Sequence, residues 1–242
     1  SQLPAQFGGA YQVTAGQGRI GQFTFLMLMF FLMIVGIIYV EQGQRRIPIQ
    51  FAKRVRGRKV MGGQSTYIPL KVNSAGVIPV IFATSILFFP ALVATSLPQD
   101  NSVTAAIRNW IDVNLANSQG TTWFYIFFLG ILIIFFTYFY TTIQFDPVRQ
   151  SDMIRRQGGF VPGVRPGIST TNYLSHIINR ITLPGSIFLA SVAVLPSIAS
   201  AIWDIPLGFS GISILITVGV ALETMKQIES QLSMRNYEGF ID

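Results

Sequence analysis

The chain has 242 residues, of which 50% are hydrophobic and only 11% are charged, and its mean hydropathy is +0.51. Soluble domains carry about 25% charged residues, so this composition excludes an ordinary water-soluble domain. The chain has no cysteine and a single histidine, His176, which excludes disulfides and argues against thiolate or histidine metal centres.

Five apolar segments are candidates to cross a bilayer, which takes about 20 residues. We predict transmembrane helices over residues 22–40, 76–97, 122–143, 181–203 and 205–225. The second of these contains Pro79 and Pro90, which either kink a packed helix or mark a helix that must move. The last is the weakest, because Asp204 and Glu223 flank its apolar part. We include it because the fourth span otherwise has no return partner.

Positive charges are concentrated in two of the connecting segments. Residues 41–75 hold eight Lys and Arg, residues 144–180 hold five and the tail 226–242 holds two, whereas residues 1–21 and 98–121 hold one each. Lys and Arg are enriched in cytoplasmic loops. We therefore predict that both long basic segments and the C-terminus face the cytoplasm. Residues 98–121 then form an external loop, in which Val103, Ile107 and Trp110 predict a short interfacial helix.

The predicted topology places the N-terminal segment, residues 1–21, outside the cell. An external segment with no initiator Met and no signal sequence is unusual for a complete membrane protein. We therefore expect further spans to precede this chain, so that it is one half of a larger membrane protein.

The first basic segment, 41–75, is longer than a connection between two helices requires. Its alternating apolar residues and the pair Gly62-Gly63 predict an ordered hairpin that projects from the membrane. Its charge has two readings, a strong topology signal or a docking surface for an acidic partner, ribosomal RNA or anionic lipids. The candidate docking residues are Arg46, Lys53, Arg54, Arg56, Arg58 and Lys59.

The second basic segment, 144–180, contains QGGFVPGVRPG at 157–167. Proline restricts φ and glycine permits positive φ, so this stretch predicts a fixed turn with Arg165 at its tip. Arg165 is interpreted either as a contact residue or as a solvated arginine.

The sequence contains no catalytic constellation, and we expect neither enzymatic activity nor a cofactor or metal. The predicted spans have almost no ionisable residues, whereas ion-coupled transporters keep such groups near the bilayer midplane. This favours a passive conduit that is powered from outside. The alternative is half of a solute transporter with broken helices, because charged groups could lie in a missing half.

Four stretches carry a family resemblance: EQGQRRIPIQFAKR (41–54), STYIPLKVNSAGVIPVIFA (65–83), FVPGVRPG (160–167) and GISILITVGVALETMKQIES (211–230). They resemble the SecY family, the channel subunit of the bacterial Sec protein translocase. Order, spacing and loop polarity agree from about residue 20 to the end. The resemblance implies an all-α integral membrane protein of the bacterial plasma membrane. In it this chain would supply spans six to ten, the C-terminal half of the channel.

The resemblance also implies roles for particular residues. Ile81 and Ile216 match the apolar ring of the pore, and 76–97 and 122–143 match the lateral gate, with Val77, Ile78, Ser85 and Phe128 as gate residues. The docking residues named above, with Arg165, would bind the SecA ATPase or the ribosome and its rRNA. The implied partners are the N-terminal half of the channel, SecE, SecG, signal peptides and nascent chains. The implied activity is movement of unfolded secretory polypeptides across the membrane and of membrane proteins into it.

Overall fold

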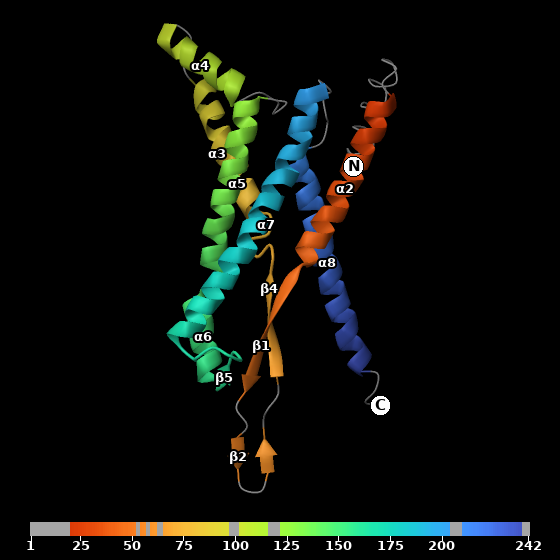
Figure 1. Cartoon of the computed structure of the whole chain (residues 1–242). Coiled ribbons are helices and arrows are strands. Elements are labelled where there is room, and N and C mark those ends of the chain that lie inside the picture. Colours follow the sequence, from red (N-terminus) through yellow and green to blue (C-terminus); the bar gives the residue numbers. More distant parts are fainter. Residues whose placement is uncertain are drawn as a thin grey trace.

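The computed structural model describes residues 20–51, 54–56, 59–61, 65–96, 102–115, 122–203 and 210–238. Five helices in this part of the chain are long and apolar enough to cross a membrane, in agreement with the sequence. They are α2 (Ile20–Gln42), α3 (Ile78–Thr95), α5 (Trp123–Gln144), α7 (Ile168–Trp203) and α8 (Gly211–Glu238). A β-hairpin extends beyond the end of this bundle at which α8 also ends (Figure 1).

Each spanning helix buries a narrow stripe and exposes the rest of its surface. In α2, the buried residues Leu26, Met29, Met33 and Ile37 recur every three or four positions, which is the period of one helix face. Between them, Phe31 is 68% exposed. A helix that is apolar on all sides needs lipid or another apolar surface on its exposed side. The composition of α2 thus fits a membrane environment.

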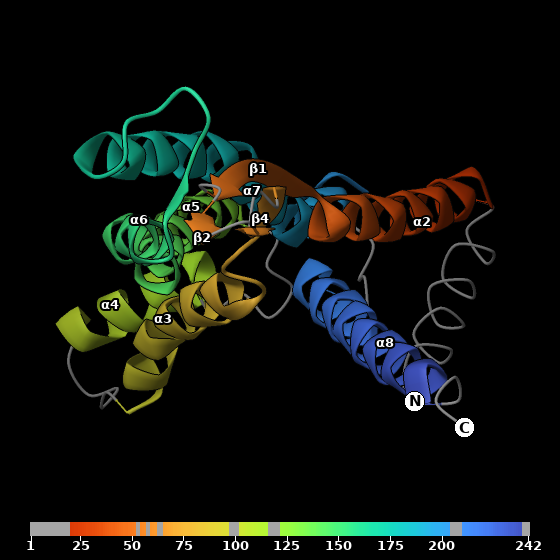
Figure 2. The same ribbon diagram turned by 90° about the horizontal axis from the view of Figure 1, so that it is seen from below.

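Helix α7 is the centre of the bundle. It packs against α5 on one flank and α8 on the other, and α3 and α2 extend these flanks by packing on α5 and α8 (Figures 1 and 2). Two glycines allow close backbone contact here. Gly211 of α8 lies directly against the carbonyl of Val192, and a Cβ added to Gly185 of α7 would lie 2.8 Å from the Val72 carbonyl oxygen.

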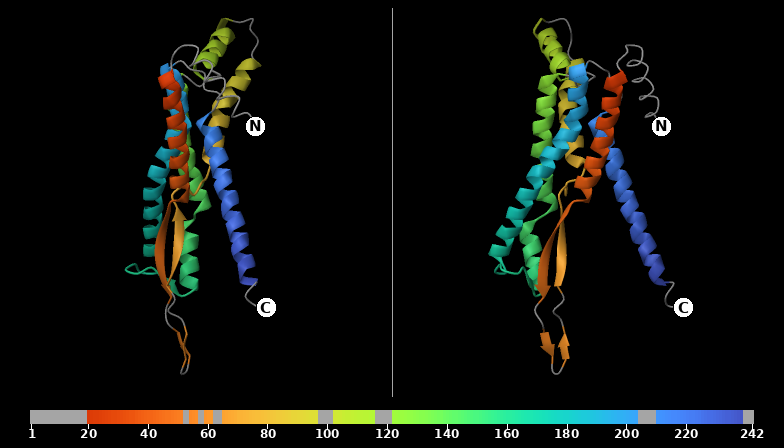
Figure 3. Two further views of the ribbon diagram at one scale, coloured as in Figure 1. Left: turned by 90° about the vertical axis from the view of Figure 1, so that its right-hand side faces the viewer. Right: turned by 45° about the vertical axis from the view of Figure 1, so that its right-hand side comes forward.

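The first basic segment folds as a projecting hairpin (Figure 3). Strand β1 (Gln44–Phe51) pairs antiparallel with β4 (Ser65–Lys71), and Gln44 lies opposite Lys71. Nearer the tip, β2 (Arg54–Arg56) pairs with β3 (Lys59–Met61). The two-residue strand β5 (Gly159–Phe160) comes from the second basic segment and pairs with the other edge of β1.

The second basic segment is mostly helical, which differs from the connecting loop expected over 144–180. Helix α6 (Pro147–Arg156) follows α5 almost directly, and α7 begins at Ile168 instead of residue 181. The reason is that an apolar run marks only the part of a helix that suits lipid. Polar residues such as His176 and Arg180 can extend the same helix into water.

The last helix also differs from its expected limits of 205–225. Helix α8 begins at Gly211 and continues to Glu238, through most of the segment expected to be a tail. The same physical reason applies, because its second half is polar and its first half is apolar. Residues 204–209, at the expected start, lie outside the described residues.

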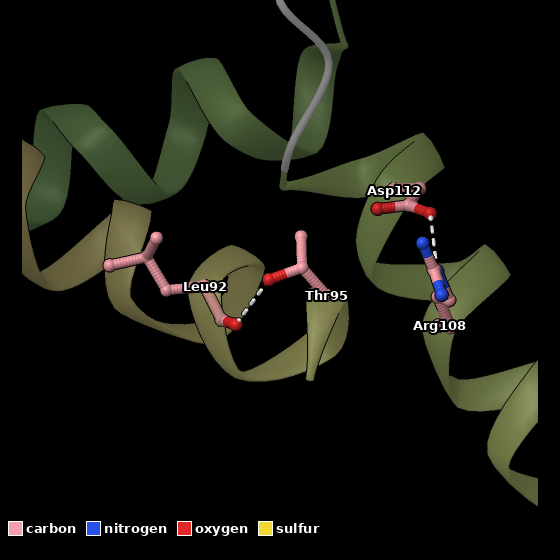
Figure 4. Close-up of polar contacts among 4 residues, drawn as sticks. All are labelled: Leu92, Thr95, Arg108 and Asp112. Carbon is pink, nitrogen blue, oxygen red and sulfur yellow. Dashed lines mark hydrogen bonds and ion pairs between the residues drawn. The ribbon is translucent and has the colours of Figure 1, made fainter. Parts of the chain in front are cut away.

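Helix α4 (Ser102–Asn114) connects α3 to α5 at the end of the bundle opposite the hairpin (Figure 1). At the end of α3, the Thr95 Oγ1 donates a hydrogen bond of 2.7 Å to the Leu92 carbonyl. Within α4, Arg108 and Asp112 form an ion pair of 3.7 Å one turn apart (Figure 4). Such exposed pairs contribute about 0.3–0.5 kcal/mol, so the pair helps the helix only slightly.

Candidate functional site

The two basic segments share a hydrophobic core outside the helix bundle, which we call the outer core. Its buried residues are Ile47, Ile49 and Leu70 of the hairpin, Ile154 of α6, Val161 directly after β5, and Leu174 of α7. Gly159 suits this contact, because a Cβ there would lie only 3.0 Å from the Ile49 Cγ2 atom and the neighbouring side chains would have to shift. The hairpin, α6, β5 and the first turns of α7 therefore form one packed unit.

Arg46 lies on the face of β1 that points away from the outer core. Ile47 and Ile49 are each 2% exposed, whereas Arg46 is exposed and lies opposite Pro69 of β4. Successive side chains of a strand point to opposite faces. The packing of the two isoleucines therefore fixes the face of β1 from which the side chain of Arg46 projects.

The other hairpin cations lie nearer the tip. Arg54, Arg56 and Lys59 belong to β2 and β3, beyond the sheet that carries Arg46. Lys53 and Arg58 lie outside the described residues. The structure thus places four of the candidate docking residues, Arg46, Arg54, Arg56 and Lys59, on strands of one projecting hairpin.

The turn that carries Arg165 is fixed by two buried hydroxyl groups. Thr170 donates from Oγ1 to the Arg165 carbonyl at 2.9 Å, and Ser151 donates from Oγ to the Gly167 carbonyl at 3.1 Å. Thr170 and Ser151 are 2% and 3% exposed, while Arg165 is exposed. Gly163 and Gly167 have φ of +83° and +107°, which residues with a Cβ rarely adopt. The backbone of the tip is therefore held rigidly while the arginine side chain points outward.

Three residues that stabilise α6 and the Arg165 turn were not among the predicted site residues: Asp146, Ser151 and Thr170. Asp146 accepts hydrogen bonds from the backbone N–H groups of Val148 and Arg149 and so caps α6. The signal was present, because Asp followed by Pro147 is the common start of a helix. Thr170 and Ser151 had no comparable signal, because their partners lie in another part of the segment.

The two candidate ring residues lie on different helices at similar depth. Val77 precedes α3, and its Cγ1 lies 3.5 Å from where a Cβ of Gly219 in α8 would be. From this contact α3 runs away from the hairpin end and α8 runs toward it (Figure 1). Ile81 comes four residues after Val77, and Ile216 three residues before Gly219. Both therefore lie about one helical turn further from the hairpin, at a rise of about 1.5 Å per residue.

The candidate gate residues lie along α3 and α5, which pack against each other. Ile78 and Phe128 are 46% and 43% exposed, and Val77 is partly buried. Ser85 is exposed, but its Oγ donates to the Ile81 carbonyl at 2.8 Å, which satisfies the hydroxyl within the helix. The exposed candidate gate positions thus present apolar side chains, or a hydroxyl that is already hydrogen-bonded within its own helix.

Aromatic rings form much of the contact between α3 and α5. Phe82 of α3 lies against Tyr140 and Phe136 of α5, with ring centroids 5.3 Å and 6.2 Å away. Ring pairs at such distances contribute about 0.5–1.5 kcal/mol beyond their buried area. These residues were not among the predicted gate residues, because their pairing depends on how the two helices are aligned.

A polar cavity of about 250 Å³ lies where α2, α3, α5 and α8 converge near the hairpin. Its charged and amide side chains are Glu41, Lys71, Asn73, Gln144, Glu223 and Lys226. These residues come from distant parts of the sequence, so no local pattern identifies them. Within the described residues, no three His, Cys, Asp or Glu side chains lie close enough to hold a metal ion.

Comparison with known proteins gives one consistent family. The SecY family model matches residues 1–225. The protein translocase subunit SecY of Streptomyces coelicolor is 47% identical over 245 residues, which cover 99% of this chain and 55% of the relative. That of Mycobacterium tuberculosis is 48% identical over 227 residues, 90% of this chain and 51% of the relative. This chain therefore spans about half the length of the relatives it matches.

Solved structures share the same fold. One, described as a study of the SecY plug domain and the closed translocation channel, has a TM-score of 0.56 and 18% identity. The match covers 93% of this chain and 54% of the chain in that structure. Another, described as a protein-conducting channel, has a TM-score of 0.55, 17% identity and coverage of 93% and 53%.

The hydroxyl of Thr170 is expected to control the rigidity of the Arg165 turn. Thr170→Val keeps the shape of the side chain but removes the donor to the Arg165 carbonyl, at a cost of about 1 kcal/mol. Amide hydrogen exchange of residues 161–171 should then accelerate roughly fivefold. Thr170→Ser, which keeps the donor, is the control and should exchange at the unmodified rate. Equal exchange in all three proteins would show that the hydroxyl does not hold the turn.

Proposed function

This chain belongs to the SecY family and is a multi-pass membrane protein, and we propose that it forms one half of a channel for unfolded polypeptides. The proposal rests on the family match along nearly the whole chain to proteins named as translocase subunits. We propose further that the other half of the pore comes from a second segment, equivalent to the remaining length of the relatives. Secretory polypeptides would cross the membrane through this pore, and membrane proteins would enter lipid from it.

We propose that the membrane is the bacterial plasma membrane and that the hairpin end of the bundle is cytoplasmic. The distribution of Lys and Arg supports this orientation. At the opposite end, α4 exposes one apolar face, on which Val103, Ile107 and Trp110 are 68%, 48% and 52% exposed. A helix with such a face and a Trp suits the interface between lipid headgroups and acyl chains. Helix α4 would therefore lie on the external surface of the membrane.

In the proposed channel, Ile81 and Ile216 contribute to an apolar ring around the translocating chain. Their similar depth on α3 and α8 supports this role. Apolar side chains resist wetting, so a narrow ring of them limits ion leakage while the channel is idle. Helices α3 and α5 form one wall of the lateral gate, with Val77, Ile78, Ser85 and Phe128 on it. Signal peptides would leave the pore along this wall.

The packed unit outside the membrane would be the docking surface. Arg46 and Arg165 lie on parts of it that share the outer core, so a partner would meet them as one rigid surface. We propose the SecA ATPase and the ribosome, including its RNA, as energy-supplying partners, and SecE and SecG as further subunits. The positive charge also suits anionic lipids. The chain itself would catalyse no covalent reaction and use no cofactor.

Half of a solute transporter is the alternative reading of the sequence. Coupled transporters need ionisable or ligating groups near the midplane of the membrane. In the described part of this chain, the charged side chains of the polar cavity lie near the hairpin end of the bundle, away from its middle. Together with the family assignment, this disfavours the transporter reading.

The orientation can be tested directly, because the chain has no native cysteine. Tyr67→Cys in β4 and Asn109→Cys in α4 place single thiols on exposed residues at opposite ends of the bundle. A membrane-impermeant maleimide should label residue 67 only in inside-out vesicles and residue 109 only in right-side-out vesicles. The reverse pattern would contradict the proposed topology.

Arg165→Glu, in a complete channel, should strongly reduce SecA-driven export, because it reverses the charge at the rigid tip of the turn. The measurement is transport of a secretory protein into vesicles that contain equal amounts of channel. Arg180→Glu is the matched control, since it changes the net charge equally on an exposed residue that lies about 18 Å along α7 from the first residue of this helix. Unimpaired export by Arg165→Glu would count against a docking role for this residue.

Ile81→Cys and Ile216→Cys should each crosslink to a cysteine in a polypeptide that is stalled during translocation. Phe31→Cys lies on the exposed face of α2 and serves as a control that should not crosslink. Crosslinks are read as a mobility shift of the channel chain. If neither isoleucine position reacts while the polypeptide is demonstrably inside the membrane, the ring assignment is wrong.

A further inference from the structure

The base of the hairpin is held closed by two hydrogen bonds between its two arms. The Val72 N–H donates to the Gly43 carbonyl at 3.0 Å, which continues the ladder between β1 and β4. Beyond it, the Asn73 Nδ2 donates to the Glu41 Oε2 at 3.0 Å. Glu41 lies in the last turn of α2, so this second bond connects a spanning helix directly to the segment that follows the hairpin.

The same amide also holds the segment that leads into α3. Asn73 Nδ2 donates to the Gly76 carbonyl at 3.2 Å. Gly76 has φ of +64°, which turns the chain sharply before Val77 and the start of α3. One side chain therefore joins three elements: the end of α2, the end of β4 and the turn that starts α3.

The segment 72–77 is fixed on its other sides by glycine contacts. The Val72 carbonyl lies against Gly185 of α7, and Val77 lies against Gly219 of α8. The approach to Gly185 is close, because a Cβ there would lie 2.8 Å from the Val72 carbonyl oxygen, whereas Val77 is in ordinary contact with α8. Along the chain, a displacement of the hairpin base reaches α3 through the turn at Asn73.

Asn73 is buried at the lining of the polar cavity. It is 4% exposed, and its Oδ1 has no hydrogen-bond partner among the described residues. An apolar residue in the same place could not donate to Glu41 and to the Gly76 carbonyl. The side chain of Asn73 thus supplies one donor group that makes two contacts at once.

We propose that Asn73 is a positioning residue that couples the hairpin to α3. Asn73 donates one hydrogen bond to Glu41 and another to the Gly76 carbonyl. When a partner moves the hairpin, these two bonds carry the movement to the start of α3. The role rests on the proposed function, in which the hairpin docks an ATPase and α3 forms part of the gate. The predicted docking, ring and gate residues do not include Asn73 or Glu41.

The test uses vesicles that contain the complete channel. It measures the affinity of the ATPase for the channel and the rate of transport separately. Asn73→Asp removes the donor and places two carboxylates together. Transport at saturating ATPase should fall about tenfold, the effect of losing one hydrogen bond to a charged group. The dissociation constant of the ATPase should stay within twofold, because Arg46, Arg165 and the outer core are untouched. Glu41→Gln is the conservative control, since its carbonyl can still accept from Asn73, and it should transport normally.

The double variant Asn73→Asp with Glu41→Gln distinguishes a loss of coupling from a simple folding defect. It restores the bond between residues 41 and 73 with reversed direction, but an aspartate at position 73 cannot donate to the Gly76 carbonyl, so transport should recover in part and stay below the unmodified rate. A parallel loss of ATPase affinity in Asn73→Asp would show that Asn73 only maintains the hairpin, and unchanged transport would show that it has no role. If the unmodified channel neither binds the ATPase nor transports, the proposed function itself fails.

Discussion

The outer core is the interaction on which the arrangement of the proposed docking surface depends. Two segments that are separated in the sequence by α3, α4 and α5 meet through Ile47, Ile49, Ile154 and Leu174. Full burial of such a side chain is favourable by about 1.5–3 kcal/mol, so the contact is strong enough to fix one segment on the other. As a result, Arg46 and the Arg165 turn do not move independently. A partner that binds either of them acts on α7 as well, because the first turns of this helix belong to the same core.

The outer unit is joined to the spanning helices in two ways. Helix α7 is continuous from the outer core into the bundle, and α6 follows α5 almost directly. At the base of the hairpin the connection is smaller, and it consists of the backbone bond from Val72 to Gly43, the amide of Asn73 and the contacts at Gly185 and Gly219. Of these two glycines Gly185 is the one that the close approach depends on, because a Cβ there would lie 2.8 Å from the Val72 carbonyl oxygen.

The sequence was sufficient to predict the five spans, because lipid requires about 20 apolar residues in a row and that signal is local. It did not predict where α7 and α8 begin and end, because a helix continues into water without any change that hydropathy detects. Thr170 and Asn73 were missed for another reason. Their roles depend on partners in other segments, and only the packing of the outer core and the helix ends brings those partners together. Asp146 is different, since Asp before Pro was a readable helix start.

The hydroxyl groups along α3 and α5 bear on whether these helices can form a gate. Thr84 and Ser85 of α3 donate to carbonyls of their own helix, and so do Thr137 and Thr141 of α5. None of these four donors needs a partner from a neighbouring helix. If α3 and α5 part from another wall, no hydrogen bond between the walls has to break at these positions. Lipid or an apolar signal peptide then meets a satisfied hydroxyl at the exposed Ser85, while Thr137 and Thr141 are buried within this half. Separation then costs chiefly apolar contact, which an apolar peptide replaces. A wall with such a surface can open and close with a small difference in free energy, as a lateral gate requires.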